Sequence, residues 1–300
     1  MAVPKNENCF KIRQATSDDV EEIWKIVKQE GWASCSFQVT RAVIEIAEDG
    51  WFVAEQDGEI LGFVMGYNIN ETTSFPGFLI VKPEHRGKYI GKALLNEVGS
   101  YMGDRRISFV AILQVEPMYV KLGNTRSPRG GVNLYSLQLR NMPIPQEAKV
   151  DYELKDYIEV DWKDLLDYDT SFHIIPRERV LNVWFEIPES KTKVIQQNGK
   201  IVGYGTIKPV PSGHVIGPLY ADTTAACMIL LNYFATAIPA NSKVLFTMPT
   251  ASEDGKRLLE YNKDTLIVVW KGVFMEKKQA PSFSKLHKVV AIFDSAICFL

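Results

Sequence analysis

Glycines and basic side chains alternate in one short segment of the chain, at a spacing that suits the binding of an anion. Arg86, Gly87, Lys88, Gly91 and Lys92 follow a short apolar strand and lead directly into an Ala-Leu-Leu helix. At such a strand–loop–helix junction, free backbone N–H groups meet the positive end of the helix dipole. The glycines let the backbone approach an anion closely, and the basic side chains add positive charge. The segment therefore predicts a seat for a phosphate or pyrophosphate group.

The spacing of the glycines decides which phosphate-bearing molecule fits. A nucleoside triphosphate loop has four residues between its glycines, followed by Lys-Ser/Thr. Here only three residues separate Gly87 from Gly91, and Ala93 stands in place of the hydroxyl. A dinucleotide-binding fold needs the pattern G-x-G-x-x-G, which this segment lacks. The remaining interpretation is a loop that binds the pyrophosphate of coenzyme A.

Residues 86–95, RGKYIGKALL, resemble the signature R-G-x-G-I-G-x-A-L-L of the GNAT acetyltransferase superfamily. Tyr89 is the one departure, because it replaces the first glycine of the signature. A Tyr89 side chain that faces inward would weaken cofactor binding, whereas one that faces solvent would be harmless. The resemblance implies that acetyl-CoA is the co-substrate, with its pyrophosphate held by Arg86, Gly87, Lys88, Tyr89, Ile90, Gly91 and Lys92.

The resemblance also implies which residues act on the acyl group. In the family the fourth strand splays from the fifth, and its exposed backbone pairs with the pantetheine arm. Here that role falls to Leu79, Ile80 and Val81. Tyr119 matches the family tyrosine that protonates the departing thiolate. The acceptor amine must lose a proton before it attacks, because its reference pKa is about 10.4, and Glu116 is a candidate for the base, an assignment that the residues leave open.

Patterns that flank the loop predict the elements that position it. Residues 10–15 are typical of a first strand. The turn Asp57-Gly58 between two apolar runs predicts a hairpin over residues 51–67. The apolar run at residues 107–113 predicts a buried central strand. These elements occur in the order that the family resemblance requires.

The chain also contains an internal repeat. Three matches occur in the same order at nearly the same offset, and the longest pairs VAEQDGEILGFVMGY with VIQQNGKIVGYGTIK without a gap. The matches are residues 53–67 with 194–208, 77–80 with 217–220, and 119–122 with 259–262. Ordered matches of this kind predict a duplicated domain.

The duplication predicts an α/β (α+β) protein with two GNAT-like domains in tandem, each a mixed, mostly antiparallel sheet flanked by helices. We place the first domain, which holds the acetyl-CoA site and a splayed pair of central strands, at residues 9–143. The divergent second copy is placed at residues 150–300. There Asp222 follows the strand, with neither Arg-Gly nor Gly-Lys after it. Asp222 is expected to cap the next helix and to repel a pyrophosphate, so we expect one cofactor site per chain.

Composition narrows the function classes further. The chain has 300 residues, of which 46% are hydrophobic and 23% charged, which is ample for two cores. Its net charge of −2 disfavours a nucleic-acid-binding protein. The four cysteines lack the spacing of metal ligands, so we expect reduced thiols and no metal. We expect a cytoplasmic protein with no membrane segment, because no apolar stretch suits a signal peptide or a bilayer span.

The sequence thus predicts an acetyl-CoA-dependent N-acyltransferase, acting as a monomer or homodimer. The acetyl group would pass directly to the primary amine of a small molecule in a ternary complex. Two alternatives stay open: an acetyltransferase that acts on lysines or N-termini of proteins or peptides, and a non-catalytic regulator that binds acyl-CoA.

Overall fold

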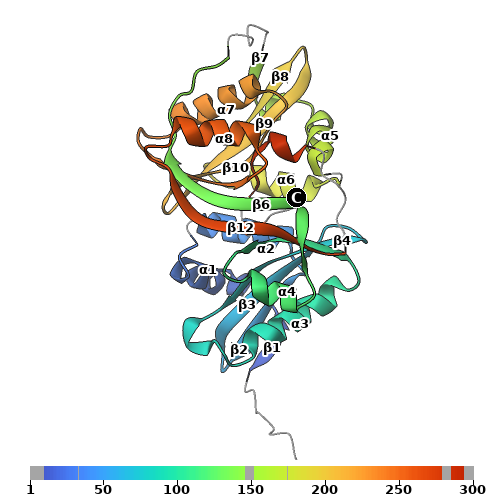
Figure 1. The fold of residues 1–300 in the computed structure, drawn as a ribbon. Coiled ribbons are helices and arrows are strands. Elements are labelled where there is room, and N and C mark those ends of the chain that lie inside the picture. Colours follow the sequence, from blue (N-terminus) through green and yellow to red (C-terminus); the bar gives the residue numbers. More distant parts are fainter. Residues whose placement is uncertain (1–9, 33, 146–151, 174, 279–284, 294–300) are drawn as a thin grey trace, which may run out of the picture. The chain divides into compact units, whose positions relative to one another are not determined.

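The computed structural model describes residues 10–32, 34–145, 152–173, 175–278 and 285–293. Its elements, drawn in Figure 1, group into two compact units, Met1–Arg105 and Arg106–Leu300, and each unit is described by itself.

In the first unit, strands β1 to β4 pair antiparallel in the order β1-β2-β3-β4. Helix α3 packs on β2, β3 and β4, and α1 packs against α2. Ile90, Leu94 and Val98 recur every four residues of α3 and are buried, as the amphipathic pattern requires. The elements are β1 (Lys11–Gln14), η1 (Ser17–Asp19), α1 (Val20–Gln29), α2 (Phe37–Ile46), β2 (Trp51–Gln56), β3 (Glu59–Asn68), β4 (Thr73–Val81), η2 (Pro83–His85) and α3 (Ile90–Met102).

The first hairpin forms where the sequence predicts it. Strands β2 and β3 are joined by Asp57 and Gly58, whose φ angles are 51° and 83°. Two consecutive positive φ angles are the requirement of the turn that matches the twist of paired strands, and Asp-Gly meets it at low steric cost. The predicted hairpin over residues 51–67 is therefore confirmed.

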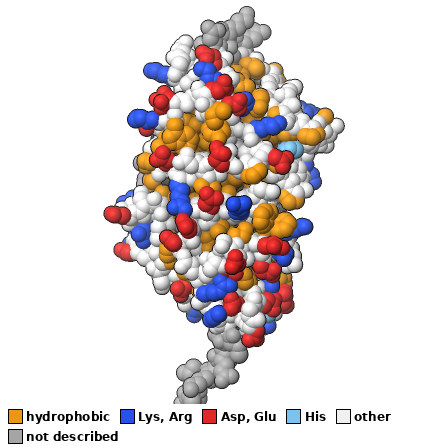
Figure 2. All heavy atoms as spheres, turned by 180° about the vertical axis from the view of Figure 1, so that it is seen from behind, with side chains coloured by type: hydrophobic (Ala, Val, Ile, Leu, Met, Phe, Trp, Pro, Cys, Tyr) orange, Lys and Arg blue, Asp and Glu red, His pale blue; other side chains and the backbone are white. Residues whose placement is uncertain are grey.

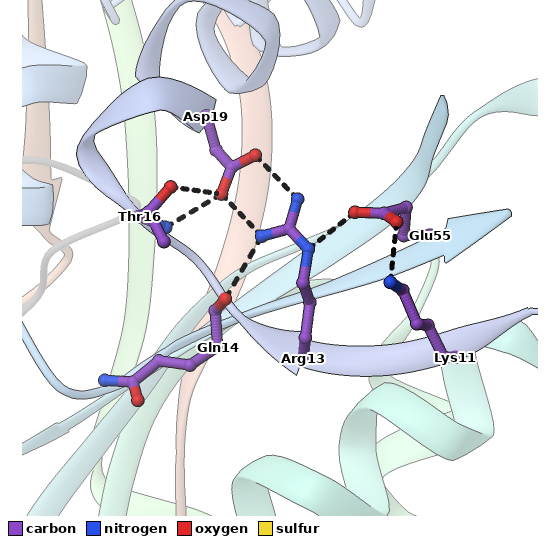
Figure 3. Close-up of polar contacts among 6 residues, drawn as sticks. All are labelled: Lys11, Arg13, Gln14, Thr16, Asp19 and Glu55. Atoms are coloured by element: carbon purple, nitrogen blue, oxygen red, sulfur yellow. Dashed lines mark hydrogen bonds and ion pairs between the residues drawn. The ribbon is translucent and has the colours of Figure 1, made fainter. Parts of the chain in front are cut away.

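A cluster of charges fixes the start of the first unit (Figure 3). Arg13 of β1 donates from Nη1 to Asp19 Oδ2 at 2.7 Å and from Nη2 to Asp19 Oδ1 at 2.8 Å, while its Nε donates to Glu55 Oε2 at 2.5 Å. The hydrogen bonds from Arg13 hold the pKa of Asp19 below its ordinary value, despite partial burial. Asp19 also accepts from the backbone N–H of Thr16 at 2.8 Å. The cluster joins β1, the first helical turn and β2 through charge-assisted hydrogen bonds.

In the second unit, one sheet runs in the order β5-β12-β6-β11-β10-β9-β8-β7, and β13 pairs with β10. The expected central strand at residues 107–113 is present as β5. The elements are β5 (Arg106–Ile112), α4 (Glu116–Lys121), β6 (Thr125–Gln138), β7 (Tyr152–Asp156), η4 (Tyr157–Glu159), α5 (Trp162–His173), α6 (Glu178–Phe185), β8 (Lys191–Gln197), β9 (Lys200–Val210), β10 (Gly213–Ala221), α7 (Thr224–Ala237), β11 (Lys243–Pro249), α8 (Glu253–Tyr261), β12 (Ile267–Lys277), η5 (Leu286–Lys288) and β13 (Val289–Ala291).

The order of elements repeats along the chain. Elements β1 to β6 run as strand, short helix, two helices, three strands, helix, strand, helix and strand, with the short helix η2 added between β4 and α3; β7 to β12 follow the same order without a counterpart of η2. The second hairpin, β8–β9, turns at Asn198 and Gly199 with φ angles of 51° and 74°. The duplication seen in the sequence is thus a duplication of structure, and β13 is an addition that follows the second copy.

The two copies exchange their last strands within the second unit. Strand β12, the last of the second copy, lies between β5 and β6. Strand β6, the last of the first copy, lies between β12 and β11. Residues such as Val132 therefore pair with Gly272 on one side and with Pro249 on the other. The domain limits 9–143 and 150–300 stay a prediction from sequence.

A buried polar cluster lies inside the second copy. Arg177 donates to the carboxylate of Asp169 from Nε at 3.0 Å and from Nη2 at 2.6 Å, and the hydroxyl of Tyr204 donates to the same carboxylate. His173 Nε2 lies 3.1 Å from the hydroxyl of Tyr220. Burial alone would raise the pKa of Asp169, but Arg177 and the hydrogen bonds outweigh it and keep the pKa below its ordinary value. These charges are paired in the core, where an unpaired charge would be costly.

Candidate active site

Strand β4 carries a bulge just before the predicted cofactor loop. Phe63 and Met65 of β3 pair with Ile80 and Gly77 of β4, so β4 uses one residue more than β3 between the two pairs. Phe78 adopts a φ of 52°, which is unusual for a residue with a side chain. Bulges of this kind bend a strand and redirect its backbone groups. The bend falls immediately before Leu79, Ile80 and Val81, the residues expected to pair with pantetheine.

Two tryptophans hold the bulge in place. The Phe78 ring is buried and lies 5.3 Å from Trp32, in the turn after α1, and 5.1 Å from Trp51 of β2, measured between ring centroids. Aromatic packing of this kind offsets the backbone strain at Phe78. Ile80 is buried, whereas Leu79 and Val81 are half-buried. The sequence did not point to Trp32 or Phe78 as supports of the site, because the bulge depends on pairing with β3.

The loop between β4 and α3 contains two residues in the left-handed region. Gly87 has a φ of 78° and Tyr89, immediately before the helix, a φ of 63°. The backbone of Tyr89 thus adopts a conformation that suits the signature glycine, at a cost of about 1 kcal/mol or more for a side chain. The Tyr89 side chain is 64% exposed. Of the two orientations considered from the sequence, the solvent-facing one is observed.

The first turn of α3 has no side chain that caps it. Tyr89 occupies the N-cap position without a capping hydrogen bond, and the first bond inside the helix is from Ala93 N–H to the Tyr89 carbonyl at 3.0 Å. The N–H groups of the preceding turn, Ile90 to Lys92, point out of the helix end as helix geometry dictates. Together with the helix dipole, they make this end an anion-binding surface.

Gly91 leaves room for a ligand at this helix end. A Cβ atom built on Gly91 would meet only Val81 Cγ2, at an ordinary contact distance of 3.6 Å. Neither positive φ nor crowding by the protein therefore requires glycine here. Glycine inside a helix costs about 0.5–1 kcal/mol relative to alanine. The space above Gly91 fits the close approach of a pyrophosphate to the backbone.

The guanidinium of Arg86 is engaged in hydrogen bonds within the protein. Its Nε donates to the Val81 carbonyl at 2.9 Å, and its Nη2 donates to Glu30 Oε1 at 2.6 Å. Arg86 thereby closes the loop onto β4 and joins it to the end of α1. Lys88 and Lys92 are exposed beside the helix end. Glu30 was not foreseen as part of the site, since it lies far from the loop in sequence.

The predicted catalytic residues Tyr119 and Glu116 lie on α4, in the second unit. The half-buried Tyr119 ring packs edge-on against Phe109 of β5, with centroids 4.7 Å apart. Burial raises the pKa of Tyr119, so its hydroxyl holds its proton at neutral pH. The end of α4 is closed by Asn124, whose Nδ2 donates to the Tyr119 carbonyl at 3.0 Å. Tyr119 is therefore in the protonation state that a proton donor needs.

Glu116 is engaged in an ion pair. Arg126 of β6 donates to both of its carboxylate oxygens, from Nε and, at 2.7 Å, from Nη2. The hydrogen bonds from Arg126 lower the pKa of Glu116. A carboxylate with a lowered pKa is a weak proton acceptor. This contact favours a structural role, in which Glu116 fastens α4 to β6, over the role of a general base.

The second copy closes the corresponding junction differently. The prediction that Asp222 caps the next helix is wrong. Thr223 caps α7 instead, and its side chain accepts a hydrogen bond from the N–H of Ala226 at 3.1 Å. Thr223 forms the cap because its backbone is extended, which directs its hydroxyl toward the first N–H groups of α7. Asp222 instead lies 3.3 Å from Lys288 Nζ. The N-terminus of α3 thus has no side-chain cap, whereas the N-terminus of α7 is capped by Thr223.

Three wider properties of the described residues bear on the site. They include no group of three or more His, Cys, Asp or Glu placed to hold a metal ion. Among the same residues, no helix combines the length and the apolar character that crossing a bilayer demands. Figure 2 shows acidic and basic side chains interspersed over one face, rather than gathered into a broad basic area on the described part of that face.

Two sequence families match the chain. Residues 17–123 match the family described as "Acetyltransferase (GNAT) family", and residues 165–277 match a family described as "Acetyltransferase (GNAT) domain". Among curated proteins, holothin acyltransferase of a Pseudoalteromonas strain is 23% identical over 237 residues, 76% of each chain. The uncharacterized N-acetyltransferase YitH of Bacillus subtilis is 23% identical over 210 residues, 69% of this chain and 71% of YitH.

Solved structures share the fold along most of the chain. An acetyltransferase candidate from Pyrococcus horikoshii superposes with a TM-score of 0.77 at 18% identity, over 96% of both chains. A tandem GNAT protein from the clavulanic acid biosynthesis pathway gives a TM-score of 0.65 at 13% identity, over 91% of this chain and 99% of that one. The two family matches together cover more than half of the chain. The chain therefore belongs to the GNAT acetyltransferase family and carries two GNAT domains in tandem.

Proposed function

We propose that this chain transfers an acetyl group from acetyl-CoA to the primary amine of a small molecule, directly and within a ternary complex. The observation that carries the proposal is the uncapped end of α3, where Gly91 leaves space and the first-turn N–H groups are directed outward. Such an end is suited to a pyrophosphate. The family membership supports the class of reaction, N-acyl transfer.

Each part of the loop has a distinct role in this proposal. The backbone N–H groups of residues 87–92 hold the pyrophosphate, and Lys88 and Lys92 add charge from its exposed side. Arg86 shapes the loop through its hydrogen bond to the Val81 carbonyl, and its bond to Glu30 offsets part of its positive charge. The backbone of Leu79, Ile80 and Val81, redirected by the bulge, pairs with the pantetheine arm and polarises the thioester carbonyl.

Tyr119 is proposed as the proton donor to the departing thiolate, because burial keeps its hydroxyl protonated. The amine must lose a proton during the reaction. Glu116 was the candidate base, and its ion pair with Arg126 makes it a supporting residue of α4 instead. We therefore assign no residue as the proton acceptor. The reaction can proceed without one if the amine is desolvated and loses its proton to water.

A small acceptor is supported by the relatives rather than by the site geometry. One relative is named for acylating holothin, and a structural neighbour belongs to the clavulanic acid biosynthesis pathway. Another neighbour of similar fold is a yeast N-myristoyltransferase with bound myristoyl-CoA, at a TM-score of 0.62. Proteins or peptides remain the second class of acceptor, as the sequence left open, and an acyl-CoA-binding regulator is the alternative without turnover.

Titration calorimetry with acetyl-CoA tests the donor site. Wild type should bind, and saturation at about 100 times Kd should raise the free energy of unfolding by about 2.7 kcal/mol. Gly91→Glu should weaken binding at least about 100-fold, because it places bulk and negative charge at the anion seat. Gly91→Ala is the matched control: it should be more stable by up to about 1 kcal/mol and bind more weakly than wild type. Unchanged affinity in Gly91→Glu would refute the site.

A panel of acceptors then tests catalysis. Release of the coenzyme A thiol is followed with a thiol-reactive dye in the presence of amino acids, polyamines, amino sugars, a lysine peptide and a peptide with an unblocked N-terminus. Turnover with a small amine supports the proposal. Turnover with peptides alone would move the acceptor to the second class. Binding of acetyl-CoA without acceptor-dependent release from any member would identify a regulator.

A further inference from the structure

Strand β13 has no counterpart among the described elements of the first copy. The order from β7 to β12 repeats that from β1 to β6, and β13 comes after both. The question is where the fold places an additional strand. Its position can be compared with the first copy through the repeat, in which residues 217–220 of β10 match residues 77–80 of β4.

The second copy keeps a bulge within one residue of the corresponding place. Ile216 and Leu219 of β10 pair with Ile207 and Gly205 of β9, so β10 again uses one residue more than its neighbour. Before the bulge, β10 pairs with β11, as Ile216 does with Phe246. After the bulge, Leu219 pairs with Ala291 of β13 instead. In the repeat, Leu219 matches Leu79 of the proposed pantetheine strand.

Strand β13 also contacts the other wall of this slot. The N–H of Ile292 donates to the carbonyl of Thr247 on β11 at 2.9 Å. The segment therefore bonds to β10 through its strand pairing and to β11 through Ile292. An extended backbone that bonds to both of two diverging strands occupies the gap between them. In the first copy, the corresponding place beside Leu79 is the one proposed above for pantetheine.

The segment is buried along its length. Val289, Val290, Ala291, Ile292 and Phe293 are each exposed by no more than 1%. The ring of Phe293 lies 5.3 Å from that of Trp184, and the guanidinium of Arg177 lies 4.3 Å from its centre. Phe293 thus packs against Arg177, which belongs to the buried polar cluster around Asp169. Burial of this extent marks a permanent occupant rather than a loosely attached tail.

The charges at the mouth of the slot are reversed relative to the first copy. Asp222 stands at the start of the connection to α7, and it lies 3.3 Å from Lys288 Nζ and 3.9 Å from Lys285 Nζ. In the first copy Arg86 and Lys88 lie in the connection to α3 and Lys92 lies in the first turn of α3, so this junction suits an anionic ligand. In the second copy the connection carries the acidic Asp222, and the segment that lies against it carries basic lysines. The connection and the segment are therefore complementary in charge, with the signs reversed relative to the basic loop and anionic ligand of the first copy.

We infer that the second copy retains the ligand slot of the fold and that its occupant is a stretch of this chain, residues 286–293, in which β13 is the extended part. The segment takes the place that pantetheine takes in the first copy, a comparison that rests on the proposed function. The second slot is consequently sealed by a polypeptide backbone, and acetyl-CoA binds at one site per chain.

A disulfide that locks the segment in place tests the inference. Leu219→Cys with Ala291→Cys pairs two residues that face each other across β10 and β13, within the Cα separation that a disulfide spans. Oxidation should form this bond in the folded protein, identified by mass spectrometry of its peptides. The control is Ile216→Cys with Ala291→Cys, which should not link, because Ile216 is flanked by β9 and β11. Failure of the first pair to link, or equal linking of the control, overturns the inference.

Acetyl-CoA titration of the locked protein completes the test. Affinity within twofold of the reduced form, at one molecule per chain, supports the inference, and Gly91→Glu in the unmodified chain should remove that single site. Loss of binding on locking would show that acetyl-CoA enters the second slot and would overturn the inference. If wild type binds no acetyl-CoA, the proposed function fails, and formation of the disulfide still decides whether residues 286–293 occupy the slot.

Discussion

The two copies of the fold treat one junction in opposite ways. In the first copy, eight residues connect β4 to α3, and the last of them, Tyr89, occupies the N-cap position without a side-chain cap. In the second, two residues connect β10 to α7, and Thr223 caps the helix. The strand before each junction carries a bulge. The comparison teaches that the fold supplies the bent strand, whereas the connection decides whether a helix end is left for an anion.

The copies also differ in where they bury charge. The second copy pairs Asp169 with Arg177 in its core and seals its slot with residues 286–293. The first copy instead keeps Lys88 and Lys92 at the surface, beside a loop with strained backbone at Tyr89. We interpret the second copy as a part whose polar residues serve stability, and the first as the part whose polar residues serve binding. The predictions below separate these two kinds of role.

The largest effect should come from the core of the second copy. Asp169→Asn leaves the buried Arg177 without a charge partner, and breaking a buried pair in this way costs about 3–5 kcal/mol. Because the pKa of Asp169 is lowered in the fold, its contribution is present above the unfolded value of 3.8 and is lost as pH falls below it. Urea unfolding at pH 7 and pH 3 measures both effects. Asp167→Asn, on the same helix but paired with Lys163 at the surface, should change stability by less than about 1 kcal/mol; equal losses would contradict the prediction.

The next effect concerns catalysis in the first copy. Tyr119→Phe should lower kcat about 10- to 100-fold and leave the affinity for acetyl-CoA unchanged. This is at or below the lower end of general acid catalysis, because a thiol with a pKa of about 8.5 leaves readily. Wild-type activity should rise with pH as the amine deprotonates. Because burial raises the pKa of Tyr119, ionisation of this tyrosine should cause no loss of activity at any pH up to about 10.

Tyr261 of α8 supplies the control for this variant. It is an exposed tyrosine on the helix of the second copy that corresponds to α4. Tyr261→Phe removes the same hydroxyl and should leave kcat unchanged. Steady-state kinetics on both variants with one acceptor makes the comparison, and a normal kcat in Tyr119→Phe would remove Tyr119 from the mechanism.

A smaller effect should follow from the contact between α1 and the loop. Glu30→Gln removes the charge that faces Arg86, which leaves Arg86 more attractive to the pyrophosphate. A surface ion pair is worth about 0.2–1 kcal/mol, so acetyl-CoA should bind up to about fivefold tighter, and less so at high salt. Glu21→Gln removes the same charge from the same helix, where it pairs with Lys25, and should leave the affinity unchanged. Titration of both variants at two salt concentrations distinguishes them; weaker binding in Glu30→Gln would mean that the loop depends on the pair for its shape.

Local patterns predicted much of this architecture, and non-local contacts account for what they missed. Both hairpins follow from Asp57-Gly58 and Asn198-Gly199, because the turn is encoded by the residues that form it. The seat proposed at residues 86–92 is likewise inferred from adjacent residues, and it stays a prediction. The exchange of β6 and β12 was not, since strand order depends on pairing between residues more than a hundred positions apart. Equally, nothing near Glu30 in sequence indicates its bond to Arg86.

The short segment at residues 289–293 shows a second limit of sequence reasoning. From the sequence, this segment counts only among the apolar stretches that do not suit a bilayer span. A buried strand of this length has the same composition as a buried turn of helix, so periodicity cannot separate the two. Likewise, Asp222 and Thr223 are both good capping residues, and only the backbone angle at Thr223 decides which of them caps α7.

The smallest effect should be found at Tyr89, the residue that departs from the family signature. Its backbone is left-handed and its side chain is exposed, so Tyr89→Gly should relieve strain and raise the free energy of unfolding by up to about 1 kcal/mol. Because the side chain faces solvent, affinity for acetyl-CoA should stay within about twofold of wild type. Asn198→Gly relaxes a left-handed residue of the second copy and should gain less, since asparagine tolerates that conformation. Much tighter binding in Tyr89→Gly would mean that this tyrosine turns inward over the pyrophosphate seat, and that the departure from the signature limits the first copy after all.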